Sequence, residues 1–527
     1  MKRTILVLLV CLIPLFGLWA GGKSDTTAPA AAAASSAPVS LDVWIYPSIN
    51  EAGPPPPDWK VPVVMKERLN IDMKFTIMPS NNADWDTKIM AAAAANTLPD
   101  LFEVRRAPWE NLVKAGLLAP VDDLYALMPN RTKFMYSPES IAYTTLNGHS
   151  YALATPGTFE KKEGMLIRQD WLDKLSLKTP VSTEDWINVM KAFTLNDPDG
   201  NGKADTYGYG AFIEINPAEE GLGRRFDPFF GAFGVAGTWN MTKANAGLNV
   251  RKSAYYDAMV YIKRIIDERV IDPNWLSYTK DDYRAAWKQG RFGLMREDGS
   301  AYSSENNYAP FDKNFPNGSW SVLNPPVGPK GDSSVGTQTP GWQLNAVSAK
   351  AAKAGKGPAI AKMLEWLSSD EGYYLAGWGE KGINYMLDAN GVPTDVGLPD
   401  PSKFFTRSDI VTITQMRRLV FYNSDVELLA RYPDYKAPTS GKLISTMGVF
   451  RDFKKSPWTN SSGADTLPKP NADIQRFYEQ GVVEFITGQR ALTPQNWAAW
   501  LADFDKLGGA DWEKAGIAAA DAAGYLQ

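Results

Sequence analysis

The order of short apolar strands and helical segments near the start of the chain constrains the fold most. Residues 41–46 alternate apolar and other side chains, residues 61–70 have helical spacing, and residues 71–78 alternate again. A second helical segment at 83–96 leads to the apolar strand 101–104. This strand–helix–strand–helix–strand order predicts a parallel sheet covered by helices on both faces, and therefore an α/β fold.

Aromatic and basic residues follow the strands of this predicted sheet. Trp44 lies near the end of the first strand, Trp59 in the loop after it, and Arg106 after the third strand. Ligands of such sheets bind beyond the carboxyl ends of the strands. We therefore expect these side chains to lie near a ligand.

The rest of the chain carries further strands and helices. Residues 163–168 are strand-like, and residues 182–193 form a predicted helix in which Ser182 or Thr183 and Asp185 make a capping box. With 527 residues, of which 44% are hydrophobic, the chain can bury at least one large core. We expect it to divide into two lobes.

The composition excludes several kinds of active site. The chain has one histidine, His149, and one cysteine, Cys11. A Ser-His-Asp triad, a Cys-His dyad or a histidine–cysteine zinc site needs residues that this chain scarcely has. His149 follows an Asn-Gly pair, which is typical of a hairpin turn. The net charge of −4, with no basic run longer than a pair, argues against nucleic-acid binding.

The amino-terminal segment predicts export. Two basic residues precede an apolar run that is short for a membrane span. Residues 1–20 are therefore interpreted as a signal peptide that is cut after Ala20, which removes Cys11. Residues 21–40 are small, polar and interrupted by proline, as in a flexible tether. We expect a protein that is free in a periplasm; a lipid-anchored protein is the less favoured alternative.

Residues 197–208, "DPDGNGKADTYG", have the pattern of a calcium-binding loop. Such loops supply side-chain oxygens from the first, third, fifth and ninth positions and a backbone carbonyl from the seventh, with glycine at the sixth. The twelfth position is Gly208 rather than the usual glutamate, and a turn without an ion is the alternative interpretation. The predicted ligands are Asp197, Asp199, Asn201, Asp205 and the carbonyl of Lys203.

Several segments, taken together, resemble one known family. They include "LPDLFEV", "WENLVKAGLLAPVDDL", "NGHSYAL", "EWLSSDEGYYLAGWGEKGINY" and "EFITGQRALT", in this order along the chain, together with the region that contains the calcium-type loop. The chain is similar to the family-1 extracellular solute-binding proteins of ABC sugar importers, a group that includes alginate-binding proteins. The likeness runs almost from end to end.

This resemblance implies a two-lobed, class II periplasmic-binding-protein-like α/β fold, in which each lobe has a mixed, mainly parallel sheet flanked by helices. The expected lobes are 41–157 with 336–372, and 158–335 with 373–527, joined by a hinge. The family holds a sugar between the lobes and delivers it to membrane permease subunits. In alginate-binding members a calcium ion occupies the corresponding loop, away from the sugar, with glutamate where this chain has Thr206. We expect a structural calcium ion and a monomer.

The predicted function is the binding of an oligosaccharide or a related polyhydroxylated solute, without catalysis. Sugars offer apolar C–H faces for aromatic stacking and hydroxyls for planar donors and acceptors. Core packing is an equal alternative for each tryptophan, and a mutual ion pair is the alternative for Arg168 and Asp170. The predicted ligand-binding residues are Trp44, Trp59, Arg106, Arg168, Asp170, Trp239, Arg296, Glu297, Trp342 and Trp378.

Two other functions stay open at this point. A secreted polysaccharide-cleaving enzyme would use two carboxylates at a set separation, and nothing local in the sequence nominates such a pair. A calcium-dependent lectin that works without a transporter is the other alternative.

Overall fold

The chain divides into two units, Met1–Pro38 and Val39–Gln527, and the elements below belong to the second unit. The predicted signal peptide and most of the predicted tether lie outside the described residues. The computed structural model describes residues 37–46, 58–79, 82–136, 138–156, 163–213, 222–338, 341–404, 416, 419, 429, 432–461, 463–464, 467–522 and 524–526.

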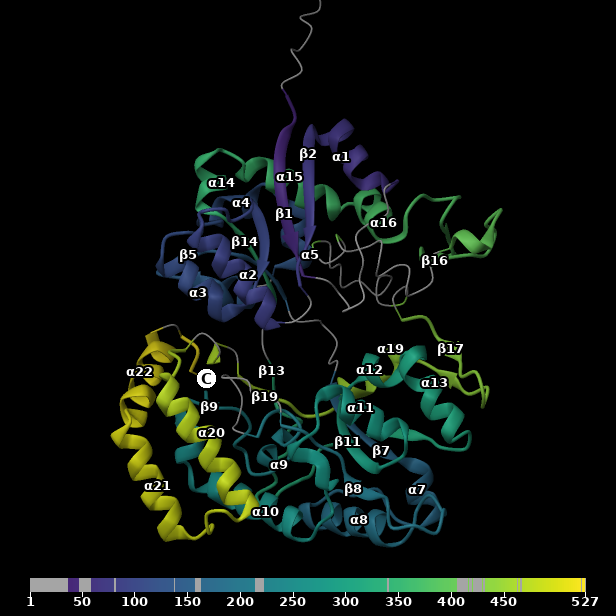
Figure 1. Cartoon of the computed structure of the whole chain (residues 1–527), viewed down its shortest axis with the longest axis vertical. Coiled ribbons are helices and arrows are strands. Elements are labelled where there is room, and N and C mark those ends of the chain that lie inside the picture. Colours follow the sequence, from purple (N-terminus) through teal and green to yellow (C-terminus); the bar gives the residue numbers. More distant parts are fainter. Residues whose placement is uncertain are drawn as a thin grey trace, which may run out of the picture. The chain divides into compact units, whose positions relative to one another are not determined.

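A five-stranded sheet, here called the first sheet, has the order β2-β1-β3-β14-β6. Strand β1 pairs in parallel with β2 (Figure 1) and with β3, as predicted. Strand β14 runs antiparallel to β3 and β6. Its strands are β1 (Val39–Ile45), β2 (Ile71–Ile77), β3 (Leu101–Val104), β6 (Leu153–Pro156) and β14 (Gly341–Val347).

Helices α1 (Lys60–Leu69), α15 (Gly357–Leu367) and α16 (Asp370–Trp378) pack with this sheet. The alternation in β1 buries Leu41, Val43 and Ile45 completely against them. Trp378 of α16 belongs to the same hydrophobic cluster. We therefore propose that the first lobe extends beyond residue 372, where the sequence analysis places its end.

A four-stranded sheet, here called the second sheet, has the order β12-β7-β11-β8. Both sheets are mixed, as expected, but the first is not mainly parallel either, since two of its strand pairs are parallel and two antiparallel. In the second sheet, however, only β11 and β8 pair in parallel, so it is mainly antiparallel rather than mainly parallel. Its strands are β7 (Glu163–Arg168), β8 (Tyr207–Tyr209), β11 (Phe292–Asp298) and β12 (Trp320–Leu323).

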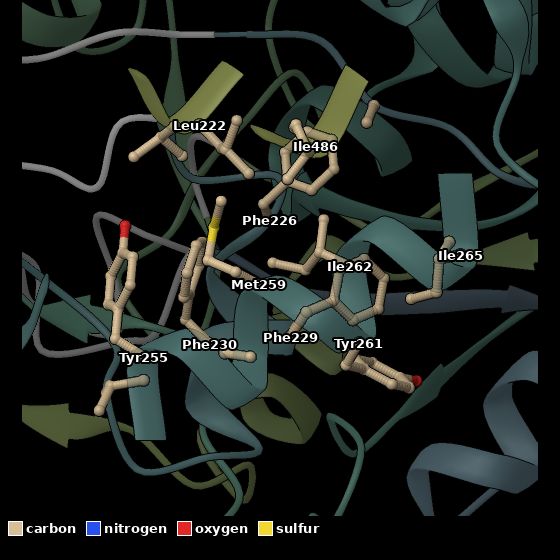
Figure 2. Packing of buried hydrophobic residues seen from close by; sticks show 14 of the residues in the cluster. Leu222, Phe226, Phe229, Phe230, Tyr255, Met259, Tyr261, Ile262, Ile265 and Ile486 are labelled. Carbon is tan, nitrogen blue, oxygen red and sulfur yellow. The ribbon is translucent and has the colours of Figure 1, made fainter. Parts of the chain in front are cut away.

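The large hydrophobic core at the second sheet combines strand residues such as Met165 and Leu294 with residues from several helices. Helix α8 (Thr183–Leu195) begins with the predicted capping box, in which Ser182 and Asp185 exchange hydrogen bonds. Helix α10 (Ser253–Asp267) packs against α9 (Asp227–Gly231) and α20 (Ala472–Thr487). Figure 2 shows Phe226, Phe229 and Phe230 among side chains of α10 such as Met259, Tyr261 and Ile262.

The remaining elements connect or cover these two sheets. The elements up to β12 are α2 (Asn82–Ala94), α3 (Arg106–Lys114), α4 (Asp122–Ala126), α5 (Pro129–Met135), α6 (Pro138–Tyr143), β4 (Thr145–Leu146), β5 (His149–Ser150), α7 (Gln169–Lys174), β9 (Trp239–Asn240), β10 (Gly247–Leu248), α11 (Lys280–Lys288), α12 (Gly299–Ser303) and α13 (Glu305–Asn314). Those that follow are β13 (Thr337–Gln338), α14 (Ala349–Lys353), β15 (Met386–Leu387), β16 (Pro393–Thr394), β17 (Tyr435–Lys436), β18 (Leu443–Ile444), α19 (Thr446–Phe453), β19 (Thr459–Asn460), α21 (Pro494–Lys506) and α22 (Gly509–Ala522).

The hairpin of β4 and β5 confirms the turn predicted at His149, because Asn147 and Gly148 both have positive φ. His149 is exposed, and its Nδ1 lies 3.2 Å from Asp122 Oδ2. Within the described part of the chain, no helix is both long and apolar enough to cross a membrane.

Replacing Phe229 by alanine is expected to lower the free energy of unfolding by about 3–5 kcal/mol, because a fully buried ring would leave a cavity. Phe229 contacts the rings of Trp186, Tyr209 and Tyr261 at centroid distances of 6.2, 5.0 and 5.9 Å. Urea denaturation measures the change. Leu276→Ala, at a side chain that is 51% exposed, is the control and is expected to cost less than about 0.5 kcal/mol.

Candidate functional site

Trp44 lies at the carboxyl edge of the first sheet, where the sequence places it. Its ring is half-buried, its Nε1 donates to Asp42 Oδ1 at 3.1 Å, and Lys88 Nζ lies 5.0 Å from the ring centroid. A cation over an indole ring orients both groups. The position fits ligand contact, which stays a prediction.

Arg106 begins α3, directly after β3, at the same edge. Its Nε donates to Glu110 Oε1 at 2.9 Å, and its guanidinium carbon lies 4.4 Å from the ring centroid of Trp109 and 4.8 Å from that of Tyr143. A carboxylate therefore already balances the charge of Arg106, and two rings hold the side chain in place.

Trp59 precedes α1 and packs against the core of the first sheet, with its ring centroid 5.8 Å from that of Phe75. Its indole N–H is buried and has no hydrogen-bond partner among the described residues. Because an unsatisfied buried donor costs about 1–3 kcal/mol, a polar ligand atom here would be stabilising.

The second sheet carries a denser set of polar groups. Arg296, near the carboxyl end of β11, is almost fully buried and donates through Nη1 to Asp227 Oδ2 at 2.5 Å. Its Nη2 lies 3.1 Å from Glu163 Oε2. Arg224 Nη1 donates to the other oxygen of Glu163 at 3.0 Å. These ion pairs bring Arg224 and Asp227, which come after β8 in the chain, to the carboxyl end of β11.

Glu297 lies beside this set and is completely buried. Arg225 Nη2 donates to its Oε1 at 3.3 Å, and Arg284 donates to both of its oxygens. Removal of a charge from such a pair leaves a buried partner charge, so these groups hold one another in place.

Two features of this edge have no signal in the sequence. The half-buried ring of Trp458 lies beside Arg296, with the guanidinium carbon 5.6 Å from its centroid. The backbone of Gly336, with φ of 146°, is so close that a Cβ there would lie 2.5 Å from Asp227 Oδ2. Long-range pairing of β13 with β19 brings these two residues to the edge.

Arg168 and Asp170 lie elsewhere. In β7, Glu163 pairs with Asp298 and Ile167 with Leu294, so Arg168 lies at the opposite end of the strand from Glu163. Arg168 donates to both oxygens of Asp170, at 2.8 and 2.6 Å, and is 2% exposed. This geometry favours the mutual ion pair over ligand contact, and the structure does not bring the pair together with Arg296.

The other predicted tryptophans are less suited to stacking. Trp239 packs edge-on to Trp512 in the core beside the second sheet, and Trp378 stacks on Phe404 in the core of the first. Both are buried, which favours the core-packing alternative. The side chain of Trp342 lies outside the described side chains, so its role stays a prediction.

The calcium-type loop is closed by its own hydrogen bonds. Asp197 accepts the backbone N–H groups of Gly200, Asn201 and Gly202, and the Asn201 side-chain amide donates to Asp199 and Asp205. Burial, and then the carboxyl group of Asp197, raise the pKa of Asp199. In the described residues, no three acidic, histidine or cysteine side chains are grouped to hold a metal.

The end of this loop differs from the calcium template for a structural reason. Gly208 lies in β8 against helix α8, where a Cβ would be 2.4 Å from the Cα of Met190. A glutamate cannot occupy that position without moving the helix. Thr206 is buried, and its hydroxyl donates to the Phe193 carbonyl at 2.9 Å, so it is a structural residue here.

Comparison with known proteins places these features in context. No family model matches the chain. It is 26% identical to the polygalacturonan/rhamnogalacturonan-binding protein YtcQ of Bacillus subtilis, over 55% of this chain and 56% of that protein. It is 30% identical to the fructooligosaccharide ABC transporter substrate-binding protein FusA of Streptococcus pneumoniae, over 43% of this chain and 42% of that protein. The chain thus spans about half the length of these curated relatives.

Solved structures establish the fold. FusA with kestose has a TM-score of 0.60 at 19% identity, covering 92% of this chain and 99% of that chain. An EF-hand mutant of FusA has a TM-score of 0.61 at 18% identity, covering 92% of this chain and 99% of that chain. The alginate-binding protein AlgQ2 without calcium ion has a TM-score of 0.62 at 15% identity, covering 92% of this chain and 98% of that chain. The chain has the fold of extracellular solute-binding proteins, which confirms the predicted fold class. The curated relatives agree with the predicted family resemblance.

Glu163→Gln is expected to lower stability at neutral pH by about 2 kcal/mol, because Glu163 holds two arginines. Burial alone would raise the pKa of Glu163, but Arg224 and Arg296 outweigh burial and hold it well below the ordinary value of 4.5. The stabilisation is therefore present above pH 4.5 and is lost as the pH falls further below that value.

Denaturation at about pH 7 and about pH 3 checks this pH dependence. The difference in free energy of unfolding between Glu163→Gln and the unchanged protein should be smaller at the lower pH. Glu184→Gln is a matched control at an exposed ion pair with Arg264 and should change stability by less than about 0.5 kcal/mol. A difference that grows on acidification would contradict the ion-pair account.

Proposed function

We propose that this chain is the extracytoplasmic solute-binding component of an ABC importer and that it captures an oligosaccharide. The observation that carries the proposal is the set of paired donors and acceptors beside Trp458 at the carboxyl edge of β11. Hydroxyl groups both donate and accept, so ordered arginine–carboxylate pairs next to an aromatic face match a sugar. The relatives are named as sugar-binding proteins, which agrees with this assignment.

The geometry also favours binding over cleavage. A glycosidase needs one carboxylic acid that stays protonated near neutral pH, which requires a raised pKa. In the carboxyl-edge cluster, Glu163, Asp227 and Glu297 are each ion-paired with arginine. For Glu163 the paired arginines lower the pKa, which is the wrong direction for a general acid. The relatives found by comparison are likewise named as binding proteins rather than enzymes.

In this function the protein is exported and hands its sugar to permease subunits in the membrane. Two lobes that close around a ligand supply the difference between loaded and empty forms that a permease can recognise. We propose that the protein acts as a monomer in a periplasm.

Binding is expected to raise the melting temperature for at least one sugar in a panel of oligosaccharides, since ligand that binds only the folded state stabilises it. Reducing ends should not accumulate during the same incubation. Small-angle scattering should give a smaller radius of gyration with saturating sugar if the lobes close. Release of reducing ends would instead support the enzyme alternative.

We further propose that the 197–208 loop binds calcium as a structural ion. Asp197, Asp199, Asn201, Asp205 and the carbonyl of Lys203 would hold it, and hard oxygen donors of this kind suit calcium. Burial raises the pKa of Asp199 most, and repulsion from Asp205 and Asp197 adds to it; a dication would offset this repulsion. The names of two similar structures, an EF-hand mutant and a calcium-free form, agree with such a site in relatives.

Calcium at about 1 mM is expected to stabilise the protein by roughly 1.4 kcal/mol if the affinity is near 10⁻⁴ M, as in extracellular modules. That corresponds to a rise of only a few degrees in melting temperature. Asp199→Ala should abolish this rise while leaving saccharide affinity within a few fold. Loss of sugar binding in a folded Asp199→Ala protein would show that the ion belongs to the sugar site.

A further inference from the structure

The ring of Trp458 is fixed next to the ion pairs of the second sheet. Pro457 accepts the Val335 N–H at 2.9 Å, and Thr459 donates its N–H to Gly336 at 3.0 Å. The Thr459 hydroxyl also lies 2.8 Å from Ser334 Oγ. Two neighbours of Trp458 are thus tied to the segment 334–336, which holds the backbone at residue 458 in place.

Two buried polar atoms of the Arg296–Asp227 pair lack hydrogen-bond partners among the described residues. Arg296 Nε is a donor, and Asp227 Oδ1 is an acceptor; both are buried and have no hydrogen-bond partner among the described residues. Asp227 is 2% exposed, so its Oδ1 is an acceptor that other described residues leave unsatisfied. A hydroxyl group can accept from one and donate to the other, whereas a ligand carboxylate has no proton to donate to Asp227.

Arg296, the cation beside Trp458, is already paired with two carboxylates. Arg224 and Arg296 face Glu163 and Asp227 in direct ion pairs. Recognition of an anion is favoured by a cation that is not already paired. A uronate placed here would add a negative charge beside Asp227, which is repulsive in a site of low dielectric.

We propose that Trp458, Arg296 and Asp227 form a subsite for a neutral sugar ring. The ring stacks on Trp458, and one of its hydroxyls bridges Arg296 Nε and Asp227 Oδ1. This inference rests on the proposed function and narrows it, because it assigns a neutral oligosaccharide rather than a uronate as the preferred ligand.

Calorimetric titration with fructo-, malto-, xylo- and galacto-oligosaccharides and with galacturonate and alginate oligomers tests the ligand class. The tightest ligand is expected to be neutral, and its affinity should change less than about twofold between low and high salt. Where a galacturonate oligomer binds, its methyl ester should bind at least about tenfold tighter than the free acid.

Trp458→Ala should lower the affinity for the tightest ligand by about tenfold. Trp458→Phe should lower it less, because phenylalanine keeps an aromatic face. Trp366→Ala is a matched control, since Trp366 is also half-buried but lies on α15 with its Nε1 bonded to Glu371. Asp227→Asn should reduce the preference for the neutral ligand, and circular dichroism establishes that each variant is folded.

The outcomes separate this inference from the proposed function. A tightest ligand that is a uronate, or binding that is unchanged in Trp458→Ala, would overturn the neutral subsite while leaving an oligosaccharide-binding protein. Failure of every oligosaccharide to bind the folded protein would overturn the proposed function, and this inference with it.

Discussion

The buried ion pair between Arg296 and Asp227 is the interaction on which the polar edge of the second sheet depends. It joins β11 to the start of α9, and the backbone of Gly336 lies directly against it. Three segments that are far apart in the sequence, around residues 227, 296 and 336, therefore contact one another at this ion pair. Because an unpaired charge in this position would cost several kcal/mol, the pair also fixes where its neighbours can lie.

Much of the local structure follows from sequence pattern. The alternation in β1 and the helical spacing of α1 reflect burial on one face, which is a local property that the chain itself displays. The capping box at Ser182 and the turn before His149 were predicted for the same reason, since a few adjacent residues decide them. The carboxyl edge of the first sheet was predicted because strand order implies it.

Long-range pairing explains what could not be predicted. Trp458 reaches Arg296 because β19 pairs with β13, and two-residue strands leave no periodic signal. The mainly antiparallel second sheet has the same origin, because strand direction depends on partners and not on the strand's own residues. Arg168 and Arg296 look alike in sequence, yet the register of β7 and β11 puts them at opposite ends of the sheet.

The close approach of Gly336 to Asp227 limits how this protein can change through evolution. A side chain at residue 336 would collide with the carboxylate, and its positive φ already disfavours other residues. Residues 227 and 336 are thus expected to vary together or not at all, whereas Trp458 can change alone. A homologue that adapts to a new sugar is therefore expected to change Trp458 first and to keep Gly336 and Asp227.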